Sequence, residues 1–520
     1  MLYFAVGNEV MATQTQIIGT WILVMLYSGV ILFFVIRGAL KIRNMADYAI
    51  GSMSFSPVAV GLSLAASMTS AATFVINPGF IANFGISAFI SYAVVFPAGA
   101  VISLIILTKS FRKYGESVKA LTLAQWIGKR YNSGVYALIM AFLSLLLITF
   151  IVLIIVALTK VLSSSLNVNE MYVLAGLVVF VFGYMMFGGA NSMVYTNTIQ
   201  AAIMLIVAFV LLGSGLENFR DGVEGFLQKL AAIDTGMVEA TYPESPLFRD
   251  LYEIIFAQFV VGMAVVVQPH IITKSLLLKK KEDVNRFLWV AVTVEIIFFL
   301  VVFTGFYARF TFPDLMANGV KLGNDGIIPA YVATAFAGSN IAVVIGLVVV
   351  MGLISAGLST LEGLIQSVST TITSDIVRPL LGHTITRDIV YITINKVAIG
   401  LLAIVAFYMS ARQLASPRLS VALLAQNGVY AYFSAAFIPV IFGIFFRNVK
   451  TAAPLAATIT AIVVHFAIYY FLPWLVSEHS WTFGTFTKYL TGPVRNPAIA
   501  ASGAIIASTI AGLVLHLKSK

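Results

Sequence analysis

Two apolar stretches of the sequence are rich in small and hydroxyl-bearing residues that could bind a cation. The first stretch, at positions 65–70, reads AASMTS, and the second, at 355–360, reads SAGLST. Their backbone and hydroxyl oxygens are hard donors of the kind that an alkali cation prefers. Neutral oxygens also avoid the cost of placing carboxylates in an apolar environment. The two stretches together indicate an ion site built by segments that are far apart in the sequence.

The elements that position these oxygens are predicted to be membrane-spanning helices. The chain is 60% hydrophobic and only 10% charged, which excludes a soluble domain. Apolar runs of about 20 residues, the length that crosses a bilayer as a helix, recur along the whole chain. We predict an all-α polytopic membrane protein with 13 spans, at 15–36, 55–78, 84–108, 134–160, 170–187, 191–213, 251–273, 287–309, 339–372, 388–410, 418–445, 451–473 and 496–517.

The charges predict the orientation in the membrane. Lys and Arg gather in segments such as 109–130 and 274–286, which places these segments in the cytoplasm, the N-terminus outside and the C-terminus inside. The net charge of +10 then follows from topology, and no nucleic-acid partner is expected. The first span is too long for a signal peptide, so no cleavage is expected. The absence of cysteine excludes disulfides, and no HxxH or HExxH spacing suggests a metalloenzyme.

The order of the spans predicts one transport domain over residues 1–520. Spans two to six, at about 55–213, and spans seven to eleven, at about 251–445, can each be read as a five-helix unit. Because five is odd, the two units would have opposite orientations, and such inverted repeats place binding sites near the middle of the membrane. Helices loosened by small and polar residues, as at 65–70 and 355–360, are tolerated there because their freed carbonyls face protein, water or an ion.

Four motifs match a known family. They are LSLAASMTSAATFVINPG at 62–79, GGANSMVYTNTIQAAIM from position 188, QPHII at 268–272 and AGLSTLEGLIQSVSTTITSD at 356–375. With its 13 predicted spans, the chain resembles the sodium:solute symporter family, which includes proline, pantothenate, sugar and monocarboxylate carriers. The resemblance implies the LeuT-type fold of ten core helices in a 5+5 inverted repeat, with one extra N-terminal and two extra C-terminal helices.

The resemblance also implies a sodium site. It falls on Ala66 and Thr69, through their carbonyl oxygens, and on Ala356, Ser359 and Thr360 in the eighth core helix. The alternative is that these hydroxyls only bond carbonyls of their own helix or pack as small groups between helices.

The sequence departs from the family at Asn197 and Glu362. Many members have Asp where Asn197 stands and a small hydroxyl residue where Glu362 stands. Three interpretations remain open. The two residues could form a second cation site with the carboxylate relocated, Glu362 could titrate and couple transport to protons, or Glu362 could be a structural hydrogen-bonding group.

The solute pocket that the resemblance implies lies just outward of the sodium. By position it includes Ala72, Thr73, Gln258, Val261 and Val265. Proline carriers have aromatic residues at the positions of Ala72, Val261 and Val265, so proline is not expected. A pocket of Ala and Val with two polar groups favours a bulkier or branched organic acid over a sugar, whose hydroxyls each need a partner.

Three further polar residues fall in or beside predicted spans. Glu295 could pair with Lys396 or stay protonated, and Lys396 could instead extend towards the cytoplasm. His270, within QPHII, is expected to hold a helix end near the inner gate.

The sequence therefore predicts a sodium-coupled symporter, not an enzyme, in a prokaryotic inner membrane. Its expected partners are sodium ions, a small organic acid of the pantothenate or monocarboxylate type, and the lipid bilayer, with no obligate protein partner. The alternatives are a proton-coupled carrier of the same fold and a membrane protein that senses the solute.

Overall fold

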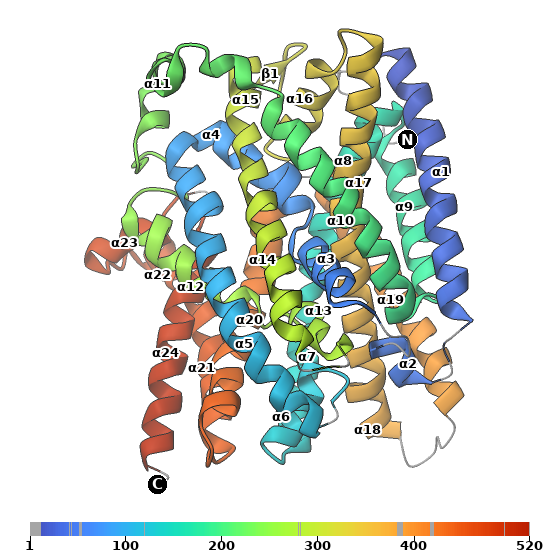
Figure 1. Ribbon diagram of the computed structural model, residues 1–520. Helices are drawn as coiled ribbons and strands as arrows, with labels where there is room; N and C mark the ends of the chain where they lie inside the picture. Colours follow the sequence, from blue (N-terminus) through green and yellow to red (C-terminus); the bar gives the residue numbers. More distant parts are fainter. Residues whose placement is uncertain are drawn as a thin grey trace, which may run out of the picture.

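The computed structural model shows a bundle of helices, most of which run along one long axis (Figure 1). It describes residues 12–40, 42, 44–50, 55–118, 120–278, 280, 282–381, 388–415, 421–492 and 494–518. The first helices are α1 (Gln14–Ala39), α2 (Met45–Ile50), α3 (Pro57–Met68), α4 (Asn77–Phe89), α5 (Phe96–Val118), α6 (Leu123–Arg130), α7 (Gly134–Ser144), α8 (Ile148–Leu166), α9 (Glu170–Met185), α10 (Gly189–Gly213), α11 (Gly222–Ile233) and α12 (Gln258–Val265). They are followed by α13 (Pro269–Ile272), α14 (Asp283–Leu300), α15 (Thr304–Thr311), α16 (Ile327–Ala335), α17 (Asn340–Thr371), α18 (Arg378–Leu381), α19 (Asp388–Ala415), α20 (Val421–Phe445), α21 (Ala452–Phe466), α22 (Leu472–His479), α23 (Thr487–Leu490) and α24 (Pro497–Lys518).

Short segments extend or join these helices. The π-helical segments are η1 (Ala72–Ile76), η2 (Ile90–Val95), η6 (Tyr252–Ala257), η9 (Ile372–Val377) and η10 (Ala467–Phe471). The 3-10 segments are η3 (Leu145–Leu147), η4 (Leu216–Phe219), η5 (Thr235–Val238), η7 (Thr273–Leu277), η8 (Val301–Phe303) and η11 (Gly484–Phe486). Strands β1 (Met316–Ala317) and β2 (Val320–Lys321) pair antiparallel, with Met316 opposite Lys321.

The long helices expose large apolar side chains on the outside of the bundle. Trp289 is 76% exposed, Leu26 68% and Ile404 67%, and a contiguous apolar exterior of this kind suits lipid and not water. Within the described ranges, ten helices are long and apolar enough to cross a membrane, and an eleventh is added if the bent pair Tyr252–Val265 and Pro269–Leu277 is one span. The protein is a mostly helical, polytopic membrane protein.

The predicted count of thirteen spans is not confirmed. The predicted spans 55–78 and 84–108 coincide with the 12-residue α3 and one continuous helical stretch, Ala72–Ser110. Gly85 interrupts this stretch with a φ of 61°, and a Cβ at that position would come within 2.1 Å of the Met237 carbonyl oxygen. The predicted span 170–187 is the 16-residue α9. The number of spans depends on whether each short helix and each part of a broken helix is counted as a crossing. The inverted repeat stays a prediction.

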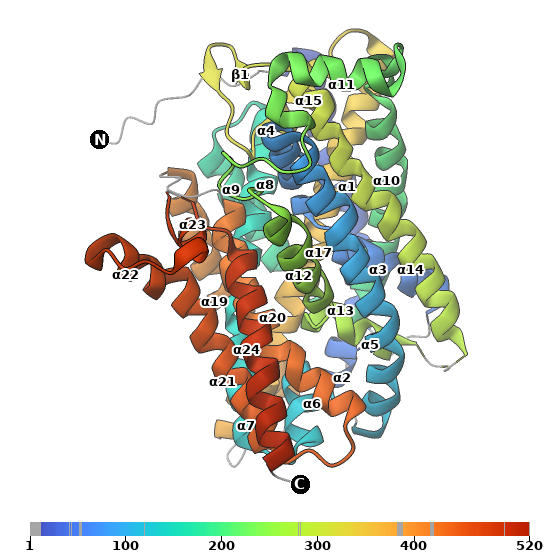
Figure 2. The ribbon, with the colours of Figure 1, turned by 90° about the vertical axis from the view of Figure 1, so that its left-hand side faces the viewer.

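The two ends of the described chain lie at opposite ends of the bundle. Figure 1 shows α1 beginning at one end and α24 finishing at the other. The basic α6 lies at the same end as the last turn of α24 in both views (Figure 1 and Figure 2). This arrangement suits the predicted topology, although which end faces the cytoplasm stays a prediction.

Two helices are broken inside the bundle. α3 stops before Thr69, whose backbone is extended, and π-helical geometry resumes at Ala72. Ser70 Oγ accepts the Ala72 N–H at 3.1 Å and so stabilises the turn within the break. The second break separates α12 from α13, which begins at Pro269, a residue with no N–H to donate. The two parts differ in direction by 57°.

The centre of the bundle is α17, which packs against α3, α8 and α10. All of its residues from 352 to 366 are buried. Small residues allow this close packing, since a Cβ on Gly352 would come within 2.5 Å of Val207, and one on Gly357 within 2.5 Å of Leu158. Each side chain in the middle of α17 therefore faces protein, and its polar groups must find partners there.

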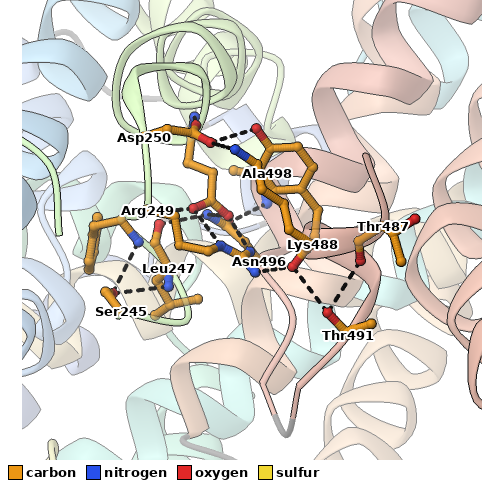
Figure 3. Close-up of polar contacts among 12 residues, drawn as sticks. Ser245, Leu247, Arg249, Asp250, Thr487, Lys488, Thr491, Asn496 and Ala498 are labelled. Carbon is orange, nitrogen blue, oxygen red and sulfur yellow. Dashed lines mark hydrogen bonds and ion pairs between the residues drawn. The ribbon is translucent and has the colours of Figure 1, made fainter. Parts of the chain in front are cut away.

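A polar cluster joins the chain just before η6 to the segment that leads into α24 (Figure 3). Arg249 binds Glu253 through Nε to Oε2, at 3.1 Å, and through Nη2 to Oε1, at 2.6 Å. Asn496 Nδ2 donates to the carbonyl oxygen of Leu247 at 3.0 Å. The start of the second broken helix is thereby tied to the C-terminal helices.

Asp250 is the second anchor of this cluster. Its Oδ2 lies 2.5 Å from Lys488 Nζ and accepts a hydrogen bond from the Tyr489 hydroxyl at 2.7 Å. Burial opposes ionisation, but the bonds from Lys488, Tyr489 and a backbone N–H outweigh it and hold the pKa of Asp250 below its ordinary value. The ionised form is therefore the one that the fold stabilises.

We expect Asp250→Asn to lower the thermal stability of the purified protein at neutral pH, by the roughly 0.2–1 kcal/mol typical of exposed ion pairs. Because the pKa of Asp250 is lowered on folding, its contribution is present above the unfolded pKa of about 3.9 and disappears as the pH falls through the folded value. Thermal unfolding of wild type and variant should therefore converge in acid.

The matched control is Asp221→Asn, which removes a more exposed partner, 3.3 Å from Lys229. Equal effects of the two substitutions at neutral pH would contradict a special role for Asp250.

Candidate cation and solute sites

The last turn of α3 and the middle of α17 bring together the oxygens that the sequence singles out. Ser359 Oγ lies 2.7 Å from the carbonyl oxygen of Ala66 and 3.1 Å from that of Ala356. Thr360 Oγ1 lies 3.1 Å from the carbonyl oxygen of Ser67 and 3.5 Å from that of Ala66. All five residues are buried. Hydroxyl and carbonyl oxygens from two separated segments therefore share one small volume.

The break after α3 explains why these contacts form. Carbonyls in the last turn of a helix have no N–H donor from a following turn, and inside a membrane each unsatisfied group costs several kcal/mol. The hydroxyls of Ser359 and Thr360 donate to them instead. A bound cation could take the place of these donated hydrogens, with the same oxygens as ligands. The contacts fit the predicted site, and sodium binding there stays a prediction.

Thr69, the fifth predicted cation ligand, lies at the break itself. It is buried, and its hydroxyl donates to Glu295 Oε2 on α14 at 3.2 Å. No hydrogen bond joins it to α17 in the part of the chain that the structure describes. Glu295 therefore has a partner in the break after α3, while Lys396 Nζ lies 4.4 Å from the ring centroid of Phe187.

Glu362 lies two residues after Thr360 and accepts hydrogen bonds on both carboxylate oxygens. Tyr184 donates to Oε1 at 2.6 Å and Gln200 Nε2 to the same oxygen at 3.4 Å. Thr196 donates to Oε2 at 2.7 Å. Two helices, α9 and α10, therefore converge on this one carboxylate.

Asn197 connects Glu362 to a buried lysine. In the amide orientation that satisfies both of its ends, Asn197 nitrogen donates to Glu362 Oε2 at 3.2 Å and to Gln200 Oε1 at 2.9 Å. Its oxygen accepts from Lys274 Nζ at 3.1 Å and from Ser67 Oγ at 2.9 Å. Asn197 and Glu362 do come together as predicted, and their role in binding a cation or a proton stays a prediction.

Lys274 is a site residue that sequence reasoning missed. Its position after QPHII predicts the start of a cytoplasmic loop, but it lies on η7 and is only 2% exposed. Its Nζ donates to the Ser63 carbonyl oxygen at 3.1 Å and to Ser63 Oγ at 2.6 Å. The only available signal was its closeness to the predicted membrane boundary, which did not indicate burial.

A cavity lies next to the break in α3, with about 690 Å³ of space between atoms that includes its opening to solvent. Its wall includes both sides of the break, the end of α12, and residues of α5, α8, α14 and α20. The lining residues are Ser67, Met68, Ser70, Ala72, Thr73, Asn77, Tyr92, Phe96, Phe150, Leu153, Val265, Gln268, His270, Phe299, Ala422, Ala425, Gln426, Val429, Tyr430 and Phe433. The cavity is therefore largely aromatic and apolar, with a few polar groups.

Three of the five predicted solute residues line this cavity. They are Ala72, Thr73 and Val265. Gln258 and Val261 are buried on the preceding turns of α12 and are not part of its wall. Solute binding by any of the five stays a prediction.

Two residues of the cavity wall also carry buried, unpaired polar atoms that the sequence did not reveal. In the described part of the chain, Gln268 Oε1 and both ring nitrogens of His270 are buried without a hydrogen-bond partner. His270 also lines a second cavity, which it shares with Lys274, with the segment just before α6, and with α2, α10 and α17. QPHII marks the break in the helix, and these unpaired atoms indicate where polar groups of a solute could bind.

A family model decides how this arrangement is classified. Residues 48–461 match the model of the sodium:solute symporter family. This chain belongs to the sodium:solute symporter family. The resemblance predicted from four motifs is confirmed, and the protein is a transporter and not an enzyme. Sodium is the coupling ion that membership of the family implies.

Characterised relatives have low sequence identity to this symporter. A sodium/pantothenate symporter of Escherichia coli K12 is 23% identical over 437 residues, which cover 81% of this chain and 83% of the relative. One from Haemophilus influenzae is 24% identical, over 55% of this chain and 57% of the relative. A sodium/glucose cotransporter of Vibrio parahaemolyticus is 26% identical, over 53% of this chain and 52% of the relative.

Solved structures support the fold. A Na+-coupled sialic acid symporter in a substrate-bound, outward-open state superposes with a TM-score of 0.75 at 16% identity, over 96% of this chain and 97% of its own. Mhp1, a nucleobase-cation-symport-1 family transporter, gives a TM-score of 0.50 at 14% identity, over 91% of this chain and 93% of its own. At these identities the comparison concerns the fold alone.

We expect the double substitution Ser359→Ala and Thr360→Ala to weaken sodium binding by at least about 10–100-fold, since a hydrogen-bonding group that contacts a charge contributes about 1.5–3 kcal/mol. The measurement is ²²Na⁺ binding to the purified protein. The matched control is Ser369→Ala on the same helix, where the hydroxyl donates to the Gln366 carbonyl oxygen at 3.2 Å. Sodium affinity unchanged in the double variant would rule out the site.

Proposed function

We propose that this symporter imports a small organic acid, of the pantothenate or monocarboxylate type, together with sodium by alternating access. The break after α3 is the observation that carries the proposal. On one side of the break, the carbonyls of Ala66 and Ser67 face the hydroxyls of α17. On the other side, Ser70, Ala72 and Thr73 form part of the cavity wall. One short segment thus contributes to both candidate sites.

This shared segment provides a physical route for coupling. Sodium bound to Ala66, Thr69, Ala356, Ser359 and Thr360 would hold α3 against α17 and order the break that lines the cavity. The solute would then meet a preformed wall and bind more tightly. When α3 and α17 move apart at the inner side, the oxygen ligands separate, and both the sodium ion and the solute are released.

The composition of the cavity supports an organic acid with a branched apolar body. Phe96, Phe150, Phe299 and Phe433 offer apolar and aromatic contacts. The unpaired atoms of Gln268 and His270 offer hydrogen bonds to polar ends of a solute. The name of the pantothenate relatives agrees with this choice. Solute contacts by Ala72, Thr73 and Val265 belong to the same proposal, whereas Gln258 and Val261, which were predicted to contact the solute, lie outside the cavity wall.

The energy available is sufficient for this transport. One sodium ion that enters down a tenfold gradient releases about 1.4 kcal/mol, and a membrane potential of 100 mV adds about 2.3 kcal/mol when net charge moves. A monoanion carried with one sodium moves no net charge, so only the chemical gradient remains. It supports about tenfold accumulation.

We further propose a prokaryotic inner membrane as the location, with the N-terminus outside and the C-terminus in the cytoplasm. The bacterial sources of the relatives support the membrane, and the opposite positions of the start of α1 and the end of α24 support placing the two termini on opposite sides (Figure 1).

We expect proteoliposomes with an inward sodium gradient to accumulate labelled pantothenate or a short monocarboxylate, and not proline. Labelled glucose is the comparison solute, because three amide side chains, Asn77, Gln268 and Gln426, line the cavity. Accumulation driven by a proton gradient without sodium would favour the proton-coupled carrier. Sodium-driven accumulation of glucose instead of the acids would replace the proposed solute class, and solute binding without any transport would favour a sensor.

Gln268→Leu should raise the KM of the transported acid about tenfold or more, because the substitution removes a polar partner inside an enclosed cavity. Sodium binding without solute should stay at the wild-type level, since Gln268 lies outside the cation cluster. Gln228→Leu, on the exposed α11, is the control for the exchange of Gln for Leu. An unchanged KM in the Gln268 variant would show that the solute binds elsewhere.

A further inference from the structure

Lys274 stands out because a buried ammonium group needs several oxygen partners. The hydrocarbon region offers none, so a lysine inside a membrane protein must find them in the protein. Its three N–H donors have three acceptors: the carbonyl oxygen of Ser63, the hydroxyl of Ser63 and the amide oxygen of Asn197. Lys274 Nζ thus sits among oxygen ligands in the manner of a bound cation.

Glu362 supplies the opposite charge. Four donors reach its two oxygens, from Tyr184, Thr196, Asn197 and Gln200. A carboxylate that accepts on both oxygens is saturated in its ionised form. An ionised carboxylate at this depth requires a counter-charge, and the amide of Asn197 links Glu362 to the Lys274 ammonium.

Asn197 is the group that makes this pair possible. Its oxygen accepts from Lys274 while its nitrogen donates to Glu362, so one side chain is in contact with both charges. An aspartate at this position would instead place a second carboxylate against Glu362 Oε2. One hydrogen-bonded group therefore contains the amide of Asn197, the carboxylate of Glu362 and the ammonium of Lys274.

The ammonium site adjoins the candidate sodium site. Ser67 connects the two, because its hydroxyl donates to the Asn197 oxygen and its carbonyl oxygen accepts from Thr360, one of the candidate sodium ligands. Glu362 follows Thr360 by two residues on α17, and Ser63 precedes Ala66 by three on α3. The same helices, α3 and α17, therefore contribute to both places.

We infer that Lys274 is a built-in cation, which occupies the place next to the sodium site where a second ion would otherwise balance Glu362. The inference rests on the proposed function and specifies its ion coupling. One sodium accompanies each solute molecule, and the remaining positive charge belongs to the protein. Transport of a monoanion is then electroneutral.

The test is equilibrium binding of ²²Na⁺ to the purified full chain without solute. Wild type should bind one sodium per chain with a Hill coefficient near one. Lys274→Met should bind two, because Glu362, Asn197 and Ser63 then face the site without the ammonium. Lys274→Arg, which keeps the charge, and the double variant Lys274→Met with Glu362→Gln, which removes both charges, should each bind one. Two sodium ions per wild-type chain, or one per Lys274→Met chain at wild-type affinity, would overturn the inference.

Glu362→Gln provides an independent test if Lys274→Met does not fold. Its uncompensated ammonium should repel sodium from the neighbouring site and lower sodium affinity, without changing the count of one. Unchanged or tighter sodium binding in this variant contradicts the pairing.

Failure of the proposed function gives a different result. In that case the double variant Ser359→Ala with Thr360→Ala still binds sodium, both on its own and in combination with Lys274→Met.

Discussion

The arrangement of this protein depends on the requirement that backbone groups inside a membrane find partners. α3 stops at Met68 in the middle of the bundle, and its last carbonyls cannot be satisfied by a further helical turn. Ser359 and Thr360 on α17 satisfy them. The break is thus stable only while α17 lies against α3. A cation bound to these same oxygens, as we propose, would affect the contact between the two helices directly and so influence the shape of the neighbouring cavity.

The sequence identified the parts of the site that are local. Ala66, Ala356, Ser359 and Thr360 lie within short motifs, and the structure brings them into one cluster. The long apolar helices were predictable for the same reason, since hydropathy is a property of consecutive residues. The number of spans was harder to predict from the sequence, because the end of α3 and the kink at Gly85 divide helical stretches in ways that apolar content does not show.

The solute cavity and the charge pair depend on how distant segments bend and meet. The residues of α12 that face the cavity depend on the 57° change of direction before Pro269, so Val265 lines it while Gln258 and Val261 do not. Lys274 follows that bend, and its burial results from the approach of Ser63 and Asn197 on other helices. A basic residue at the end of an apolar run predicts a cytoplasmic loop, and only the tertiary structure shows otherwise.

The two polar features of the bundle have opposite consequences. The proposed sodium ligands at Ser359 and Thr360 are neutral oxygens, which would lose little when a monovalent ion leaves. The pair of Lys274 and Glu362 cannot release its cation, because the ammonium is covalently attached. In this proposal an ion that is exchanged in each cycle lies among neutral ligands, while the carboxylate is balanced by the protein itself. The amide of Asn197 belongs to the same arrangement, because it contacts both the ammonium of Lys274 and the carboxylate of Glu362.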